Sequence, residues 1–289
     1  MSIRLEPPHQ AARAELPELA ALLEVALPRP RPWLPDLEWQ YLRNPAGLAW
    51  CVNARSDSGR LIAHYAVIPV PALDDPRFAS LRNFFSLNTA VHPQAAVPGL
   101  MVATARALLG QLESLHPALV LGVANENSFI GFSRLLGFQP LGRLALSFHP
   151  PFALPHGRVP RALRWDEAML AWRASRPGAE MFARPSRGAL LRRIHHRGLP
   201  LDAVLAVGLP AEVVARLGLP AGPRSLVPAA PRFYASFGAR SPGGVPVPDR
   251  LRPSPLEYVF RPLAPAIDRE ALGAFLAARR FEFLDFDVV

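Results

Sequence analysis

Apolar and polar positions follow one another along the first half of the chain with two periods, one typical of helices and one typical of strands. Between Ala11 and Leu27 the apolar residues have helical spacing, and the proline-rich stretch that follows ends the predicted helix. A short connector of Asp, Ser and Gly at residues 56–59 predicts a β-hairpin. The predicted elements of this half are helices over residues 11–27, 35–44, 99–115 and 127–135 and strands over residues 48–54, 61–70, 80–91, 118–123 and 139–148.

This order predicts an α/β fold in which helices flank a mixed sheet. Prolines interrupt the pattern from His149 to Pro160, so we place a domain boundary there, with a first domain over residues 1–150 and a smaller α/β domain over residues 151–289. The second domain could be a diverged copy of the first. Its predicted elements are helices over residues 165–174, 187–195 and 268–278, strands over 201–207, 225–228 and 256–261, and an apolar tail over 281–289.

Composition narrows the class of protein. The 289 residues are 50% hydrophobic, and the net charge of +9 comes from 32 arginines in a chain without lysine. These arginines are scattered, which favours a solvated basic surface or a phosphorylated ligand over a nucleic-acid partner. The longest basic run, Arg192-Arg193 with His195-His196, is expected to be solvated surface as well.

Cysteine usage and hydropathy exclude further classes. Cys51 is the only cysteine, which excludes an internal disulfide and a cysteine-based zinc site, and its apolar neighbours predict a core position. No metal site is expected. No stretch reaches the roughly 18 apolar residues of a membrane span, and the first ten residues lack the apolar core of a signal peptide. We therefore expect a cytoplasmic protein, with a homo-oligomer left open.

Three features that could bind a nucleotide-bearing cofactor follow one another between Leu87 and Phe138. A strand ends in Asn88-Thr89-Ala90-Val91-His92-Pro93, and a loop leads into a helix at Gln94 to Met101. A second strand then runs into Asn125-Glu126-Asn127-Ser128, and a helix closes in Leu136-Gly137-Phe138. Free amides at a helix N-terminus bind phosphate groups, and separated strands can hold an extended ligand as if it were a strand.

This succession resembles the GNAT superfamily of acyl-CoA-dependent N-acyltransferases. In that family a Val-His-Pro-like strand end leads to a pyrophosphate loop, and an Asn-rich turn precedes a helix that closes in Leu-Gly-Phe. The loop here keeps Gly99, while Ala96, Pro98 and Met101 depart from the family pattern, and Ser133 stands where the family often has a tyrosine that reprotonates the thiolate. The resemblance implies acetyl-CoA or another acyl-CoA as cosubstrate, bound by Ala90, Val91, Ala96, Val97, Gly99, Leu100, Met101, Asn125, Asn127 and Phe132.

The segment before this region is similar to a bacterial subgroup of GNAT-like proteins associated with surface-polysaccharide or amino-sugar pathways. Its residues are Trp39-x-Tyr41-x-x-Asn44-Pro45-x-Gly47 and the strand around His64-Tyr65, and the subgroup often ends in an aromatic run leading to Asp-x-Asp-Val. The resemblance implies an amine acceptor, with an amino sugar as the leading candidate, held by Tyr41, Asn44, Tyr65, Asp285 and Asp287.

Three residues are candidates for proton transfer: Glu126, His64 and Ser133. Imidazole titrates near neutrality, so His64 could deprotonate the attacking amine, but a hydrogen-bonded, half-buried histidine is the competing interpretation. Glu126 could be the base or a solvated loop carboxylate. Asn125 and Asn127 could bind pantetheine or cap a helix, and Asp285 with Asp287 could simply form the polar face of a terminal strand.

The sequence thus predicts an acyl-CoA N-acyltransferase that works by direct attack of a neutral amine on the thioester. One alternative is a GNAT-derived binding or scaffold protein without catalysis, which the residues Ala96, Pro98 and Ser133 favour. Another is a transferase that takes its acyl group from a different donor such as aminoacyl-tRNA, as in Fem-type transferases. The expected partner is a small-molecule amine, and no nucleic acid is expected.

Overall fold

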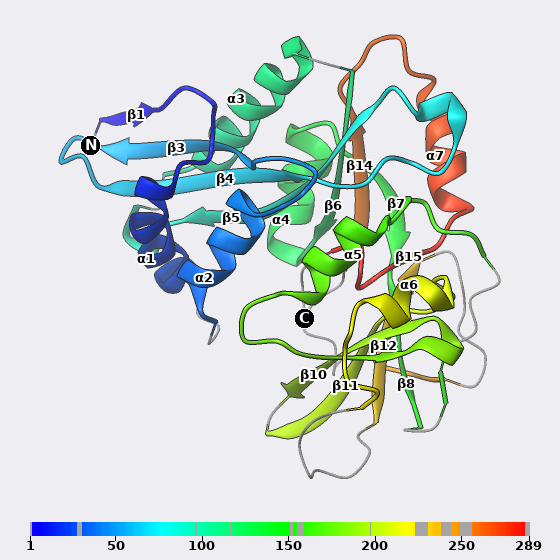
Figure 1. Ribbon diagram of the computed structural model, residues 1–289. Helices are drawn as coiled ribbons and strands as arrows, with labels where there is room; N and C mark the ends of the chain where they lie inside the picture. The colour runs from blue at the N-terminus through cyan, green and yellow to red at the C-terminus, as the bar shows by residue number, and fades with distance from the viewer. Residues whose placement is uncertain are drawn as a thin grey trace.

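Two mixed β-sheets flanked by helices make up the fold, which confirms the predicted α/β class (Figure 1). The computed structural model describes residues 2–27, 31–95, 97–115, 117–150, 153–154, 159–196, 198–222, 231–237, 244–248 and 256–286. Among these residues, no helix is both long and apolar enough to cross a membrane.

The first sheet has the strand order β1-β3-β4-β5-β6-β14-β7, and β2 pairs with β3 at its edge. Helix α3 covers one face of the sheet, and α1 with α2 covers the other (Figure 1). We call this sheet with these helices the first unit. Its strands are β1 (Ile3–Leu5), β2 (His9–Gln10), β3 (Trp50–Ser56), β4 (Leu61–Pro69), β5 (Arg82–Val91), β6 (Ala118–Ala124), β7 (Gln139–Arg143) and β14 (Glu257–Pro262).

The helices of the first unit agree with the predicted segments. Leucines spaced at three and four positions bury the inner face of α1, and the apolar stripe of α3 packs on β3 and β4. The elements are η1 (Arg13–Glu15), α1 (Leu16–Ala26), α2 (Trp33–Leu37), the π-helical turn η2 (Glu38–Leu42), η3 (Pro76–Phe78), η4 (Pro93–Ala95), α3 (Leu100–Leu115), α4 (Glu126–Ile130) and the π-helical turn η5 (Gly131–Leu135).

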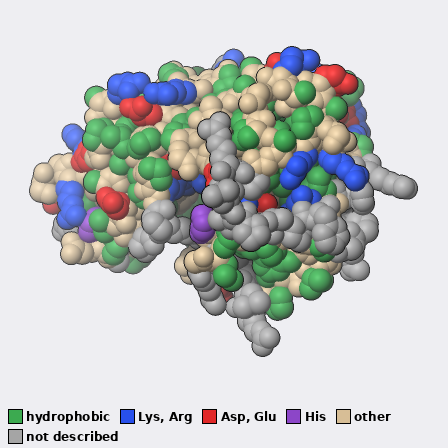
Figure 2. Space-filling view, turned by 60° about the horizontal axis from the view of Figure 1, so that its bottom comes forward, with side chains coloured by type: hydrophobic (Ala, Val, Ile, Leu, Met, Phe, Trp, Pro, Cys, Tyr) green, Lys and Arg blue, Asp and Glu red, His purple; other side chains and the backbone are tan. Residues whose placement is uncertain are grey.

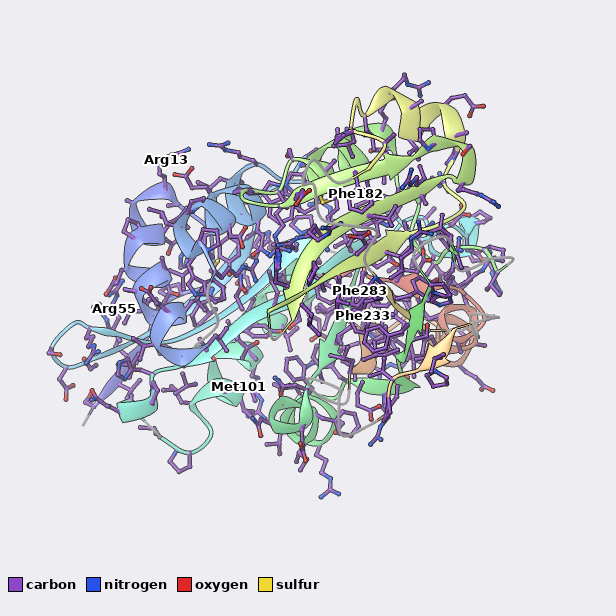
Figure 3. All side chains as sticks on the ribbon, turned by 90° about the horizontal axis from the view of Figure 1, so that it is seen from below. Arg13, Arg55, Met101, Phe182, Phe233 and Phe283 are labelled. Carbon is purple, nitrogen blue, oxygen red and sulfur yellow. The ribbon has the colours of Figure 1, made fainter. Side chains whose placement is uncertain are left out.

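The second sheet has the order β9-β10-β11-β12-β8-β13, with β15 paired to β12, and we call it with its helices the second unit. Phe233 and Phe283, from β12 and the C-terminal turn, lie against each other beside this sheet (Figure 3). The elements are β8 (Ala145–His149), α5 (Glu167–Ala174), β9 (Glu180–Arg184), η6 (Pro185–Arg187), β10 (Ala189–His196), β11 (Leu199–Ala206), α6 (Ala211–Arg216), β12 (Arg232–Phe237), β13 (Val245–Pro246) and β15 (Phe281–Glu282). Helix α7 (Arg269–Ala277), which precedes β15 along the chain, packs on β7 of the first sheet.

The two units exchange one strand each. In the first sheet β14, from the second half of the chain, lies between β6 and β7; in the second sheet β8, from the first half, lies between β12 and β13. Strand order and strand direction are then the same in both units, including one parallel pair, β5 with β6 and β11 with β12. The second sheet therefore repeats the topology of the first, as a diverged copy would. The sheets cross the predicted boundary at residue 150, and separate domains over residues 1–150 and 151–289 stay a prediction.

Two tryptophans mark the approximate symmetry between the units. Trp39 in η2 and Trp172 in α5 stack with their ring centroids 4.6 Å apart, and each indole N–H donates to the other residue's carbonyl, at 2.8 and 3.0 Å. Each begins a similar motif, Trp39-x₃-Arg43-x-Pro45-x-Gly47 and Trp172-x₃-Arg176-Pro177-Gly178. Both glycines have positive φ, 128° and 65°. A search of the sequence for repeats of one fixed length misses this relationship, because the two motifs differ in length.

The structure corrects several predicted elements. The helix predicted over residues 187–195 is wrong, because Ala189–His196 form the strand β10, whose alternation buries Leu191 and Arg193 together. The predicted single strand at residues 139–148 is two strands, β7 and β8, which belong to different sheets. The solvated basic surface expected at Arg193 is wrong, because Arg193 is buried and its Nε donates to Asp202 at 2.6 Å. The predicted strand at residues 225–228 lies outside the described residues.

Because the tryptophan pair is buried between the units, its loss should destabilise the whole fold. We expect Trp39→Phe, which removes one indole N–H bond and part of the stacked area, to lower the free energy of unfolding by about 2 kcal/mol. The control is Trp50→Phe, a half-buried tryptophan outside this pair, for which we expect a smaller loss. Chemical denaturation measures both, and equal losses would contradict a special role of the pair.

Candidate functional site

The predicted cofactor region lies where two parallel strands separate. Strands β5 and β6 pair from Arg82 with Ala118 to Ser86 with Gly122, and pairing stops there although both strands continue. Among the described residues, no segment pairs with the remaining part of β5, Leu87–Val91, on the side that faces β6. We call the space between Leu87–Val91 and Val123–Ala124 the wedge.

A β-bulge in β5 coincides with the start of the wedge. On β4 one residue, Tyr65, separates His64 from Ala66, whereas two residues of β5, Asn88 and Thr89, lie opposite it. Asn88 has φ of +50°, the one positive value among the described non-glycine residues. Asparagine tolerates this left-handed conformation better than most residues, and a bulge of this kind re-aims the strand.

Helix α3 begins beside the end of β5. Gly99, with φ of +79°, turns the chain into the helix. The Leu100 N–H donates to the Val97 carbonyl at 3.2 Å, and the amides that follow it in the first turn have no acceptor inside the helix. Val97 and Gly99 are exposed, as a phosphate-binding loop requires, while Leu100 is buried in a small core under the loop. His92 follows β5 and accepts the Gln94 N–H at Nδ1. Ala96 lies outside the described residues.

The Asn-rich turn after β6 is a helix start. The Asn125 side chain accepts the Ser128 N–H at 2.9 Å, and Ser128 Oγ accepts the Asn125 N–H, which forms a capping box. Glu126 and Asn127 are exposed in the first turn. Capping accounts for Asn125 without a ligand, so its predicted contact with pantetheine stays a prediction.

The following helix fixes two more candidates. Ser133 is half-buried and donates its hydroxyl proton to the Phe129 carbonyl at 2.7 Å, so that proton is engaged in the helix. Phe132 is buried against Tyr65 and Phe138 in the core under α3. Ser133 as the acid that reprotonates the thiolate stays a prediction, which this hydrogen bond makes less favourable.

The structure brings the two predicted cofactor segments together. A Cβ on Gly131 would lie 2.6 Å from Met101 Cε, so the Met101 side chain, which is labelled in Figure 3, contacts the end of α4 on the other side of the wedge. Only glycine leaves room for this contact at position 131. The loop that begins α3 and the turn that follows β6 therefore flank the same wedge, 30 residues apart in sequence.

His64 is fully buried and hydrogen-bonded on both ring nitrogens. Its Nδ1 lies 2.7 Å from Asn53 Oδ1 and its Nε2 lies 3.0 Å from the hydroxyl of Tyr41, which is also fully buried. Burial lowers the pKa of His64 to about 3 and raises that of Tyr41. A general base must contact the substrate and must be able to take up a proton, and the buried His64 side chain meets neither requirement. The geometry therefore argues against His64 as the proton acceptor and against direct contact of Tyr41 with the amine substrate.

The other predicted acceptor contacts lie apart from one another. Tyr65 is buried on the α3 face of the sheet, and Asn44 bonds the Pro69 carbonyl and the Ala46 N–H in a turn. Strand β15 ends at Glu282, so the predicted terminal strand with an Asp285–Asp287 face is wrong at Asp285. Asp285 is buried in a turn, where it accepts hydrogen bonds from the Trp165 indole and the Glu282 N–H. Asp287 lies outside the described residues.

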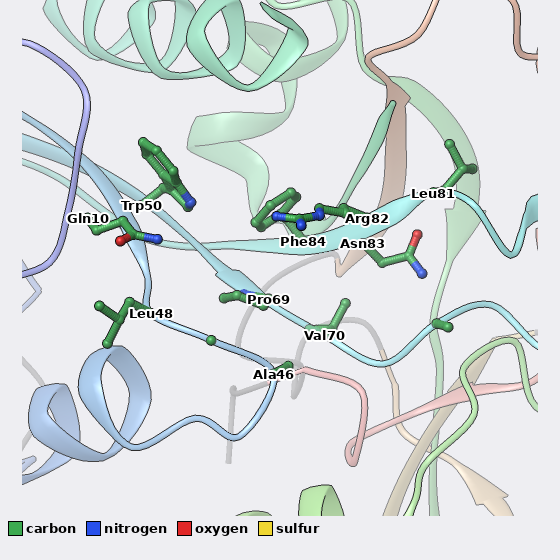
Figure 4. A pocket seen from close by; sticks show the side chains of 12 residues that line it. Gln10, Ala46, Leu48, Trp50, Pro69, Val70, Leu81, Arg82, Asn83 and Phe84 are labelled. Carbon is green, nitrogen blue, oxygen red and sulfur yellow. The ribbon is translucent and has the colours of Figure 1, made fainter. Parts of the chain in front are cut away.

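A pocket of about 360 Å³ opens at the other end of β5 (Figure 4). Trp50, Phe84 and Leu48 are among its apolar lining residues, and Arg82 adds a charged side chain to the lining. The wedge begins after Ser86 and continues toward Val91, away from this pocket, so the pocket is not part of the predicted cofactor region.

Comparison with known proteins supports the fold. No family model matches the chain, and no curated protein matches it. Among solved structures, a probable N-acyltransferase from Enterococcus faecalis superposes with a TM-score of 0.58 at 11% identity, over 91% of this chain and 73% of that one. A GCN5-related N-acetyltransferase from Kribbella flavida superposes with 0.52 at 12% identity, over 91% and 72%. A putative acetyltransferase from Pyrococcus horikoshii gives 0.51 at 10% identity, over 90% and 89%. The chain thus has a GNAT-like fold.

His9 and Glu15 form an ion pair, and the Glu15 carboxylate also accepts a hydrogen bond from the Asn53 side chain. This pair should make the free energy of unfolding depend on pH. The hydrogen bond to Glu15 raises the pKa of His9 from 6.5 to about 9. A raised pKa adds stability that is complete below pH 6.5 and is lost as the pH rises through 9. We expect His9→Gln to cost about 1 kcal/mol at pH 6, after solvent screening, and nothing at pH 10.

Urea denaturation at the two pH values checks this expectation. The control is His195→Gln, because the His195 side chain is exposed at the end of β10. A cost of His9→Gln that stays constant or grows toward pH 10 would contradict the assigned ion pair.

Proposed function

We propose that this protein is an acyl-CoA-dependent N-acyltransferase whose cosubstrate binds in the wedge between β5 and β6. The observation that carries the proposal is the end of strand pairing at Ser86 and Gly122 directly beside the N-terminus of α3. An extended ligand with amides at one end and phosphates at the other fits this arrangement, since the strands offer backbone hydrogen bonds and the helix offers free amides.

The second unit supports this interpretation by its contrast with the first. There the equivalent strands β11 and β12 stop pairing at Val204 and Tyr234, and the chain's own segment enters between them. Leu284 N–H donates to the Leu205 carbonyl at 2.9 Å on one side, and β15 pairs with β12 on the other. A strand-like segment of the chain thus fills the gap between β11 and β12, which we call the second wedge. In the first wedge, between β5 and β6, the pantetheine arm of the cosubstrate would take that place.

The pyrophosphate of the cosubstrate would bind the loop of Val97, Gly99 and the first turn of α3. The helix dipole adds a favourable positive potential there, and no acidic residue occurs in the first turn of α3. The basic excess of the chain agrees with an anionic ligand.

The chemistry would be direct attack of a neutral amine on the thioester carbonyl. Backbone N–H groups near Ala90 and Val91 would polarise that carbonyl, and electrostatic stabilisation of this kind is commonly the largest contribution to such reactions. Glu126, exposed beside the wedge, would accept the amine proton directly or through water. The collapsing intermediate would release the coenzyme A thiolate, which takes a proton from water or from the protein.

An amino sugar is the acceptor we propose by resemblance to the polysaccharide-associated subgroup. Figure 2 shows arginine, acidic and histidine side chains beside apolar ones on one face of the molecule. A mixed polar surface of this kind suits a hydroxyl-rich amine better than an apolar one.

One observation favours the second candidate function, a binding protein without catalysis. The Met101 side chain contacts Gly131 and so lies across the approach between the two cofactor segments. Calorimetry decides between the two: the enzyme requires that acetyl-CoA bind, and absence of binding at millimolar cosubstrate would overturn it.

The loop assignment can be tested with two isosteric changes at Gly99, which has no atom within 4 Å of a Cβ built there. Asn and Asp tolerate positive φ similarly well, so they differ chiefly in charge. We expect Gly99→Asp to weaken coenzyme A binding about tenfold or more and Gly99→Asn about twofold, since a negative charge at a phosphate site costs on the order of 1 kcal/mol. Equal effects in calorimetry would mean that the phosphates bind elsewhere.

The role of Glu126 can be tested by the pH profile of acyl transfer. With acetyl-CoA and a panel of amino sugars and simple amines, we expect Glu126→Gln to lower kcat/KM by about 10²-fold and to shift the acidic limb of the profile. The control is Glu113→Gln, on α3 away from the wedge. An unchanged limb in Glu126→Gln would remove Glu126 as the base while leaving the transferase proposal intact.

A further inference from the structure

Behind the β5 bulge, five polar side chains form one hydrogen-bonded chain through the first unit. From its outer end the order is Glu15, Asn53, His64, Tyr41 and Asn88, and the donor–acceptor distances along it are 3.1, 2.7, 3.0 and 3.1 Å. Asn53, His64 and Tyr41 are buried, with 2% or less of their surface exposed. These buried side chains come from separate elements, so a chance alignment of neighbours in sequence does not explain the chain.

The direction of every hydrogen bond is fixed from one end. The Glu15 carboxylate can only accept, so Asn53 turns its amide Nδ2 toward Glu15 and its Oδ1 toward His64. His64 must then carry its proton on Nδ1, and Nε2 accepts the Tyr41 hydroxyl proton. The Tyr41 oxygen is left as an acceptor for Asn88 Nδ2.

The charge states of the five side chains in this hydrogen-bonded series are equally fixed. Although burial opposes ionisation, hydrogen bonds from His9, the Ala12 N–H and Asn53 lower the pKa of Glu15, which keeps it an acceptor. Burial keeps His64 neutral and Tyr41 protonated. The chain therefore does not switch with pH near neutrality; it is a rigid support.

The inner end of this support is the strained residue of the wedge. Asn88 Nδ2 donates both to Tyr41 and to Gln40 Oε1, the latter at 2.9 Å, and Gln40 is itself buried. Two acceptors on one amide nitrogen hold the side chain, and the side chain holds a backbone with φ of +50°. That backbone directs the following residues, Thr89 and Ala90, along the wedge.

We propose that Asn88, with the chain of Tyr41, His64, Asn53 and Glu15 behind it, positions the β5 amides against the thioester carbonyl. This role rests on the acyl transfer proposed above and gives His64 and Tyr41 positioning functions in place of contact with substrate. Small displacements of such donors are costly because the transition state is stabilised only when they point at the developing oxyanion.

Tyr41→Phe removes the link between His64 and Asn88 and keeps the ring. We expect kcat to fall about tenfold with the dissociation constant of acetyl-CoA within about twofold, since binding along the wedge does not need the strained geometry. The control is Tyr258→Phe, another fully buried tyrosine, whose hydroxyl has no hydrogen-bond partner among the residues that the structure describes. It should leave kcat unchanged.

A pair of changes at His64 separates positioning from general-base catalysis. The side-chain oxygen of Gln can replace Nε2 as the acceptor for Tyr41, whereas Asn reaches only the Nδ1 position and keeps the bond to Asn53. We expect His64→Gln to retain most of kcat, His64→Asn to resemble Tyr41→Phe, and both to keep the acidic limb of the pH profile. Loss of that limb in both variants would show that His64 is a base and would overturn the inference.

Glycine at position 88 supplies the decisive comparison, because it adopts positive φ without support from a side chain. We expect Asn88→Gly to retain kcat and to abolish the effect of Tyr41→Phe, so the two changes are strongly non-additive. Asn88→Ala should lose kcat. Additive losses would mean that Tyr41 acts on stability alone and would overturn the inference.

Hydrogen–deuterium exchange over residues 84–95 gives a second measurement that does not depend on turnover. Tyr41→Phe should exchange faster there, and the double change with Asn88→Gly should not. Unchanged exchange in Tyr41→Phe overturns this inference and leaves the transferase proposal standing. A wild-type chain that binds acetyl-CoA and acylates none of the amines overturns both.

Discussion

The reciprocal exchange of β8 and β14 is the constraint on which the rest of the structure depends. Each exchanged strand lies inside its sheet, between two strands of the other half of the chain, so its backbone hydrogen bonds and its side chains are shared by both units. Tyr258 and Phe260 of β14 are buried in the central core, which also takes residues from α1, α5 and the C-terminal turn. The stacked tryptophans close the same interface from the helical side. The two units therefore form one cooperative body.

The gap between the two parallel strands is occupied differently in the two units. The second wedge is bridged by the segment at Phe281–Leu284, which the buried cluster of Arg161, Glu282 and Tyr234 holds in place. The first wedge has the bulge, the strained Asn88 and the exposed helix start instead. The same topology thus serves once as a packed core and once as a candidate site, which agrees with function depending on local residues more than on fold.

The sequence predicted most of the first unit because local signals there agree with the final structure. Leucine spacing marks α1, the Asp-Ser-Gly connector marks the β3–β4 hairpin, and Gly99 marks the start of α3. It failed at β10, where Arg192, Arg193 and the histidines suggested an exposed helix, because a charge that is buried beside Asp202 leaves no trace in a linear pattern. The strand exchange could not be predicted either, since β6 pairs with a strand more than 130 residues away.

The candidate site, like the fold, was predicted from the sequence only in part. The motifs marked two segments as a candidate cofactor site, and the contact of Met101 with Gly131 shows that these segments lie close together, while their binding of a cofactor stays a prediction. The support behind Asn88 was missed, because Glu15, Asn53 and Gln40 are unremarkable in sequence and acquire their meaning only when α1, β3 and η2 meet. The one signal available was Asn88 in the middle of a predicted strand, because asparagine is depleted in strands. Its tolerance of positive φ is a physical reason for an asparagine at such a position.

The exchanged strand also has a consequence for how the protein is made. On a ribosome the chain emerges from its N-terminus, and β6 and β7 are complete long before β14 appears at residues 257–262. Until then the first sheet has two open edges in the place of β14, and open edges invite pairing with other chains. Production of the intact protein should therefore be sensitive to the speed of translation and to chaperones that cover β-edges, and premature termination before residue 257 should yield aggregates in place of a smaller folded protein.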